Sequence, residues 1–174
     1  TQVLSDIFTI QEIKKKSISK LKLCWIGDAN NNMMNSLIEA CIKFSVSLNI
    51  ACPKNYQPNK VLISLIKKQK GKIKIFNKKE KAVKNSDVVM TDKIISLNDK
   101  VNKKKKLKSF KNFKVDTKTM NLAKKDAIFL HCLPRGNEVT EEVFLGKQSR
   151  VWQQALNRVY VQKSILLYCF DKLR

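Results

Sequence analysis

Apolar clusters rich in β-branched residues recur along the chain and are separated by longer stretches with helical spacing. Apolar runs of about 4–8 residues are typical of strands that are buried on both faces, and spacings of three and four indicate amphipathic helices. The alternation therefore predicts an α/β fold, with βα units around a parallel sheet flanked by helices. The predicted strands span residues 21–26, 48–52, 72–76, 87–90, 113–116 and 127–130.

The predicted helices span roughly residues 32–45, 58–68, 79–84, 99–110, 117–123 and 157–171. The opening segment, 4–15, carries apolar residues at helical spacing and predicts one more amphipathic helix, packed on the sheet within residues 1–16. No internal repeat or linker divides the chain, so residues 1–174 are expected to form one domain.

Three polar segments directly follow predicted strands, at residues 27–32, 91–96 and 131–134. Ligands bind beyond the carboxyl ends of the strands in such sheets, so we expect the three segments to open on one rim. The first segment, Gly-Asp-Ala-Asn-Asn-Asn, is also the composition of a simple turn and helix cap. Its functional alternative is that the amides hold a carboxylate at a helix N-terminus.

The other two segments have the same two interpretations. Asp92 is either a helix cap or the partner of an ammonium group, assisted by the hydroxyl of Ser96. Cys132 and the chain's one histidine, His131, are ordinarily buried structural residues, but their adjacency before a proline favours a site. Arg158 is a planar, permanently charged donor in a chain whose other basic residues are nearly all lysine.

Charge and cysteine content decide between classes of protein. The net charge of +22 raises the possibility of nucleic-acid binding, but the lysine runs contain no aromatic residues on which bases could stack. Five widely spaced cysteines and one histidine predict neither a disulfide framework nor a metal site. The chain has no long apolar run and its N-terminus does not resemble a signal peptide, so we expect a cytoplasmic protein that binds no membrane.

Five motifs, in order, resemble those of the ornithine carbamoyltransferases. Residues 1–12 are similar to that family's segment after His-Pro, residues 25–31 to Trp-x-Gly-Asp-Gly-Asn-Asn, and residues 91–96 to Thr-Asp-x-x-x-Ser. His-Cys-Leu-Pro at 131–134 matches outright, and Asn157 with Arg158 follows as in the family's C-terminal run. The resemblance covers essentially the whole chain.

The resemblance implies a Rossmann-like domain, the ornithine-binding half of a two-domain subunit that transfers a carbamoyl group from carbamoyl phosphate to L-ornithine. It implies a homotrimer, no cofactor, and no activity for this half alone. The implied ornithine-binding residues are Asn31, Asp92, Ser96 and Leu97. The implied carbamoyl-phosphate contacts are Gln2, Cys132, Leu133 and Arg158, of which Cys132 and Arg158 are the catalytic candidates.

Some positions depart from the family pattern. Ala29 replaces a glycine, and the run that follows is one residue longer, so Asn31 and Asn32 are both candidates for the ornithine contact. Gln154 and Leu156 replace two glutamates beside Arg158. The cysteine at 132 favours ornithine over aspartate as substrate, while acylated ornithine or another amine stays open. A lysine-rich nucleic-acid-binding domain is the alternative of another class.

Overall fold

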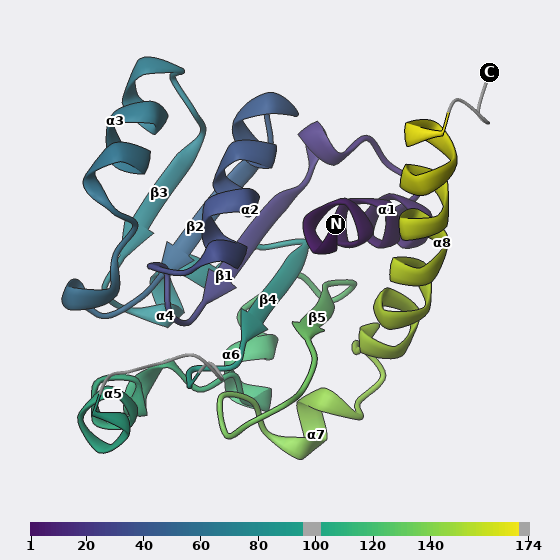
Figure 1. Cartoon of the computed structure of the whole chain (residues 1–174). Coiled ribbons are helices and arrows are strands. Elements are labelled where there is room, and N and C mark those ends of the chain that lie inside the picture. Colours follow the sequence, from purple (N-terminus) through teal and green to yellow (C-terminus); the bar gives the residue numbers. More distant parts are fainter. Residues whose placement is uncertain (96–101, 171–174) are drawn as a thin grey trace.

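The computed structural model describes residues 1–95 and 102–170, and it contains one five-stranded sheet. All neighbouring strands pair in parallel, in the order β3-β2-β1-β4-β5 (Figure 1). The strands are β1 (Lys22–Ile26), β2 (Ser47–Ala51), β3 (Ile73–Phe76), β4 (Val88–Asp92) and β5 (Ile128–Cys132). The predicted parallel α/β architecture is confirmed. The strand order changes direction between β1 and β4, which is where such sheets leave room for a ligand.

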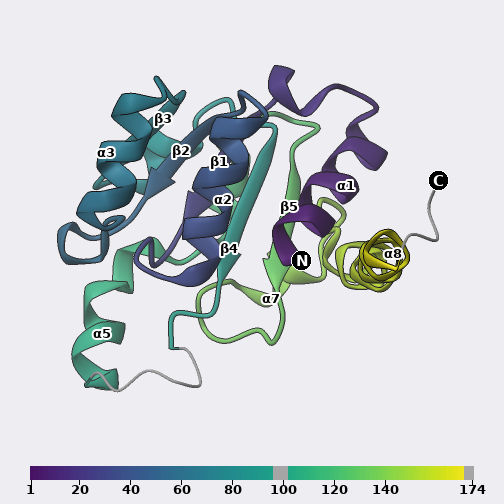
Figure 2. The same cartoon turned by 45° about the horizontal axis from the view of Figure 1, so that its top comes forward.

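Helices cover both faces of the sheet (Figures 1 and 2). The α-helices are α1 (Gln2–Lys14), α2 (Asn32–Lys43), α3 (Lys60–Lys68), α4 (Lys79–Val83), α5 (Lys103–Ser109), α6 (Thr117–Asn121), α7 (Glu141–Phe144) and α8 (Val151–Cys169). Short 3-10 helices lie at Ile18–Lys20, Lys54–Tyr56 and Lys111–Phe113.

Alternate residues of each strand enter two separate cores. Leu23 and Trp25 of β1 pack with residues of α1, α2 and α3, whereas Cys24 and Ile26 pack with residues of α4, α6 and α7. All four β1 side chains are at most 1% exposed. A strand buried on both faces is mostly apolar, which is why the sequence shows near-continuous apolar runs at the central strands.

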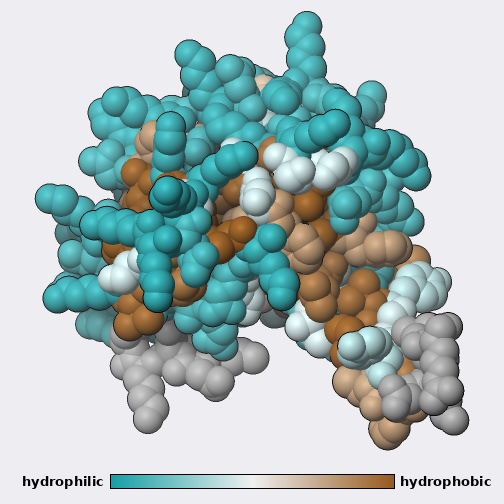
Figure 3. All heavy atoms as spheres, turned by 90° about the horizontal axis from the view of Figure 1, so that it is seen from above, coloured by the Kyte–Doolittle hydropathy of each residue, from teal (hydrophilic) through white to brown (hydrophobic). Residues whose placement is uncertain are grey.

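Helix α8 packs against α1 beside the sheet (Figure 2), and its far end projects from the body of the domain (Figure 3). Large apolar side chains are exposed along it, and Figure 3 shows apolar surface gathered there. These side chains include Leu156, Val159, Leu166, Leu167 and Tyr168.

The strand predicted at 113–116 is wrong. Phe113 ends a 3-10 helix, and Val115 makes only an isolated parallel bridge with Val139, away from the sheet. Asp116 ends the segment because its carboxylate caps α6 by accepting from the Thr119 N–H. Phe113 and Val115 are apolar because they are buried in the second core, and burial of a loop resembles burial of a strand in sequence.

The last helix begins at Val151, six residues before its predicted start at 157. No side chain caps its N-terminus, so the sequence carries no start signal there. Helix α7 was not predicted. The other predicted helices and strands lie within a few residues of the observed ones, while the expected start at 99 and end at 171 fall outside the described residues.

Leu48 lies at the centre of the first core and is fully buried, whereas Leu166 on α8 is 58% exposed. We expect Leu48→Ala to lower the free energy of unfolding by about 2–5 kcal/mol, because it removes buried methyl groups and leaves a cavity. Leu166→Ala is the matched control and should change it by less than about 0.5 kcal/mol. Denaturant unfolding measures both, and similar losses would contradict the assignment of the core.

Candidate functional site

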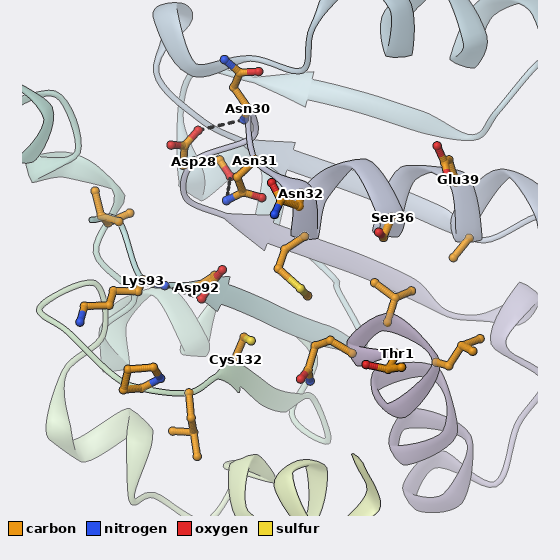
Figure 4. A pocket seen from close by; sticks show the side chains of 18 of the residues that line it. Thr1, Asp28, Asn30, Asn31, Asn32, Ser36, Glu39, Asp92, Lys93 and Cys132 are labelled. Carbon is orange, nitrogen blue, oxygen red and sulfur yellow. Dashed lines mark hydrogen bonds between the residues drawn. The ribbon is translucent and has the colours of Figure 1, made fainter. Parts of the chain in front are cut away.

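A cavity of about 850 Å³ opens at the carboxyl ends of β1, β4 and β5. Its walls also include the first residues of α1 and one side of α2 (Figure 4). Most of the residues singled out in the sequence line it together: Gln2, Asn31, Asp92, Cys132 and Leu133. The three polar segments therefore do open on one rim, as expected.

Asp92 and Cys132 are neighbours because of the strand register. They are paired residues at the last position of β4 and β5. Met90 and Leu130, two residues earlier, both enter the core under α1 and α2, and side chains of a strand alternate with a period of two. Asp92 and Cys132 therefore project on the same side, toward the start of α2 with Asn31 and Asn32 (Figure 4).

The turn after β1 depends on Gly27, whose φ of 149° is a conformation that other residues rarely adopt. A Cβ there would also approach the Thr91 hydroxyl to 3.4 Å. That hydroxyl donates to the Ile26 carbonyl at 2.6 Å, and the Trp25 indole N–H donates to the Asp28 carbonyl at 3.1 Å. These bonds hold the turn between β1 and β4.

Asp28 forms a buried ion pair with Lys106 of α5. The Lys106 Nζ lies 2.7 Å from one carboxylate oxygen, and both side chains are at most 7% exposed. The other carboxylate oxygen accepts from the Asn30 N–H at 2.9 Å. Breaking a buried pair is costly because one charge is left without compensation, so the pair fixes α5 against the turn after β1.

Asn31 is the N-cap of α2. Its side-chain oxygen accepts from the Met34 N–H at 2.9 Å, and its amide nitrogen donates to the Asp28 carbonyl at 3.2 Å. The capping interpretation is confirmed for this residue. It does not exclude a ligand, because the amide nitrogen carries a second N–H. Asn32, the first residue of α2, is exposed and lines the same cavity.

Asp92 is a partly buried carboxylate whose Oδ1 accepts from the Lys93 N–H at 2.7 Å. Burial raises the pKa of this carboxyl, although the Lys93 hydrogen bond opposes the shift. A carboxylate that burial destabilises is a strong potential partner for a cationic group, because an ammonium would offset the cost of desolvation.

Burial is also the main cause that raises the pKa of the Cys132 thiol to about 12, and the nearby carboxylates of Asp92 and Asp6 add to it. Arg158 opposes the shift. The thiol is therefore protonated at neutral pH. A thiol in that state acts as a weak hydrogen-bonding group and is a poor nucleophile.

His131 points away from the cavity, into the second core. Its Nε2 lies 2.8 Å from the Glu138 carboxylate, and its ring packs against Phe129 and Phe144. Burial raises the pKa of Glu138, but hydrogen bonds from His131 and the Gly136 N–H outweigh it and hold that pKa below its usual range. The structural interpretation of the histidine is confirmed.

Arg158 reaches the rim only indirectly. Its guanidinium donates to the Gln2 side-chain oxygen at 3.0 Å, and Gln2 in turn donates to Asp6 at 2.8 Å. Gln2 lines the cavity, whereas Arg158 is absent from the described residues that line it. Ser96 and Leu97, also expected at the site, lie outside the described residues.

The described part of the chain contains no cluster of three or more His, Cys, Asp or Glu side chains that could hold a metal. In residues 1–95 and 102–170, no helix is long and apolar enough to cross a membrane.

Sequence reasoning missed three residues that organise the site: Asp6, Lys106 and Gln154. Lys106 lies within a run of four lysines, and nothing local distinguishes it from its exposed neighbours. Asp6 lies within the first motif, residues 1–12, and Gln154 was considered only as a departure from the family pattern. The one available signal was an aspartate four residues after Gln2, a spacing that places both side chains on the same side of a helix.

Comparison with known families matches residues 19–169 to the family model described as "Aspartate/ornithine carbamoyltransferase, Asp/Orn binding domain". The chain belongs to this carbamoyltransferase family.

Curated relatives and solved structures agree with this assignment. The ornithine carbamoyltransferase of Ruthia magnifica subsp. Calyptogena magnifica is 43% identical over 98% of this chain and 56% of its own length. The solved anabolic ornithine carbamoyltransferase of Campylobacter jejuni superposes with a TM-score of 0.89 at 39% identity, covering 98% of this chain and 58% of that one. The Pyrococcus furiosus enzyme gives 0.85 at 35% identity, covering 95% and 54%. The carbamoyltransferase domain described here thus spans little more than half the length of the relatives that it matches.

The raised pKa of Cys132 leads to a labelling experiment on this carbamoyltransferase domain. At pH 8 a thiol with a pKa of about 12 carries about a thousandth of the thiolate of an ordinary cysteine. We expect iodoacetamide to label the exposed Cys169 long before Cys132, as followed by peptide mass spectrometry. Labelling of Cys132 as fast as Cys169 would contradict the protonated state.

Proposed function

We propose that residues 1–174 are the ornithine-binding half of an ornithine carbamoyltransferase. The reaction transfers the carbamoyl group of carbamoyl phosphate to the δ-amine of L-ornithine and yields L-citrulline and phosphate. The observation that carries this proposal is the pairing of Asp92 with Cys132 at adjacent strand ends, facing the asparagine-capped start of α2 across one cavity. Family membership supports the same reaction class.

The two sides of the cavity suit the two charges of an amino acid. The N-terminus of α2 offers backbone N–H groups, the positive end of the helix dipole and the amides of Asn31 and Asn32, all of which favour a carboxylate. Asp92 lies opposite and suits the α-ammonium group. Ser96 and the backbone of Leu97 are the further ornithine contacts in this proposal.

In the transfer step the neutral δ-amine attacks the carbamoyl carbon and forms the new C–N bond. The C–O bond to phosphate then breaks, and the proton lost by the amine passes to the departing phosphate. Orientation and charge stabilisation are the catalytic contributions that this chemistry needs from the protein, and it needs no cofactor. An amine nucleophile and an activated acyl phosphate make a covalent enzyme intermediate unnecessary.

Four residues of this chain are proposed to face the carbamoyl group. Cys132, with its protonated thiol, orients the δ-amine and the carbamoyl group, and Leu133 contributes its backbone beside it. Gln2 reaches carbamoyl phosphate from the start of α1. Arg158 stabilises the charge that develops on oxygen and phosphate, and its bond to Gln2 places it next to the rim.

Family resemblance extends the proposal to a homotrimer in the cytoplasm, with the carbamoyl-phosphate site completed by a second domain. The opposed carboxylate and amide groups suit a zwitterion better than a simple diamine. Acylated ornithine is the alternative substrate, and nucleic-acid binding through the +22 net charge is the alternative of another class.

The complete protein that contains this domain is expected to form citrulline from L-ornithine and carbamoyl phosphate, and residues 1–174 alone are expected to form none. A colorimetric citrulline assay measures both, with N-acetylornithine and putrescine as competing acceptors. Transfer by residues 1–174 alone would refute the division of the site between two domains. Absence of transfer by the complete protein, together with salt-sensitive binding to duplex DNA, would favour the nucleic-acid alternative.

Asp92→Asn should weaken ornithine binding by about 2–5 kcal/mol, because it removes the charge that pairs with a buried ammonium, and should leave carbamoyl-phosphate binding nearly unchanged. Because the pKa of Asp92 is raised, ornithine affinity of the wild type should fall as pH decreases through that raised value, while the Asn variant lacks this dependence. Isothermal titration measures the affinities. Asp126→Asn, on the surface, is the control. Equal losses for both ligands would show that Asp92 only shapes its loop.

A further inference from the structure

Asp6 lies where α1, α8 and the end of β5 meet, and it is 1% exposed. Its Oδ1 accepts two hydrogen bonds, from the Gln2 side-chain amide at 2.8 Å and from the Gln154 side-chain amide at 2.7 Å. Gln2 is on the same helix, whereas Gln154 comes from α8. One carboxylate oxygen thus joins two helices.

The carboxylate decides which way both amides face. A primary amide has a donor end and an acceptor end, and an ionised carboxylate only accepts. Gln2 and Gln154 must therefore turn their nitrogens toward Asp6, which leaves their oxygens facing outward. A reversed Gln2 amide would present N–H groups to another donor, the Arg158 guanidinium.

The side-chain oxygens of Gln2 and Gln154, which face away from Asp6, both accept hydrogen bonds near the site. The Gln2 oxygen accepts from Arg158 at 3.0 Å. The Gln154 oxygen accepts from the backbone N–H of His131 at 3.0 Å, directly before Cys132. A continuous hydrogen-bonded chain therefore runs from Arg158 through Asp6 to the end of β5.

We propose that Asp6 is a positioning residue of the transfer reaction: by holding the two glutamine amides in one orientation it sets Arg158 and Cys132 relative to each other. This inference rests on the proposed function, because it assigns a role within the same site. Asp6 acts through its neighbours and does not line the described cavity.

Protonation of Asp6 gives the proposal a measurable signature. Burial raises its pKa to about 6, while hydrogen bonds from Gln154 and Gln2 oppose the shift. Its Oδ2 is buried and has no hydrogen-bond partner among the described residues, so a proton can reside there while Oδ1 still accepts. The charged and titratable groups that face Asp6 are Asp92 of β4, Cys132 of β5 and Arg158 of α8.

Three variants separate positioning from packing. Asp6→Asn keeps an acceptor oxygen for both amides, whereas Asp6→Leu removes it on a side chain with the same number of heavy atoms. Glu12→Leu is the matched control, because Glu12 accepts from the Gln153 and Asn157 amides of α8 at the other end of the same helix contact.

Turnover of the complete protein is the first readout. Asp6→Leu is expected to lower it about 10- to 100-fold, since a small misplacement of reacting groups can have that effect, while Asp6→Asn restores most of it. Glu12→Leu should lower thermal stability with turnover nearly unchanged. An equal loss of turnover in Glu12→Leu and Asp6→Leu would overturn the proposal, because general helix packing would then explain both.

NMR gives a second readout that needs no activity. The Arg158 and Gln154 side-chain N–H signals should show a common step with a midpoint near pH 6 in the wild type and in Glu12→Leu, and Asp6→Asn should lack that step. Persistence of the shift in Asp6→Asn would overturn the proposal, even if Asp6→Leu does not fold. Absence of transfer activity in the wild type would refute the proposed function. The NMR signals would still test whether Asp6 positions the two glutamine amides.

Discussion

The parallel sheet changes its strand order between β1 and β4, and the whole candidate site depends on that change. The chain leaves β1 toward one edge of the sheet and β4 toward the other, so the rim between them is left open. The turn that starts at Gly27 and the carboxylate of Asp92 lie on the two sides of this opening. Pairing of β5 with β4 then adds Cys132, because the register places it beside Asp92.

Buried polar contacts keep the strand ends in place. Lys106 holds the turn after β1 through its ion pair with Asp28. Glu138 binds the His131 ring in the second core, and the Gln154 side chain binds the backbone N–H of His131. Such groups are costly to desolvate and contribute little net stability, but they tolerate few alternative geometries. A site that works by orienting its reactants needs this kind of support, because small displacements of the reacting groups lower the reaction rate strongly.

The electrostatics of the site agree with the proposed chemistry. Burial keeps the Cys132 thiol protonated and therefore a poor nucleophile, and it raises the pKa of Asp92 by destabilising the carboxylate. An amine substrate brings its own nucleophile, and its ammonium end would stabilise the Asp92 carboxylate. A nucleic acid carries no ammonium group that could pair with Asp92 in this cavity.

Much of the fold could be predicted from the amino-acid sequence alone. The strands of a doubly covered sheet are mostly apolar, so β1, β2, β4 and β5 are visible as apolar runs, and the polar segments after them indicated the rim. Local composition could not show that Phe113 and Val115 are buried in a loop, because burial leaves the same pattern in a loop and in a strand.

The cap signals of the sequence left Asn31 with two interpretations, and only the structure showed its bond to the Met34 N–H. Tertiary structure alone decided the strand order, the register between Asp92 and Cys132, and the partners of Asp6 and Lys106. Gln154 is 148 residues from Asp6 in the chain. Contacts at such separation depend on how helices and strands pack, and a pattern read over a few neighbouring residues carries no information about them.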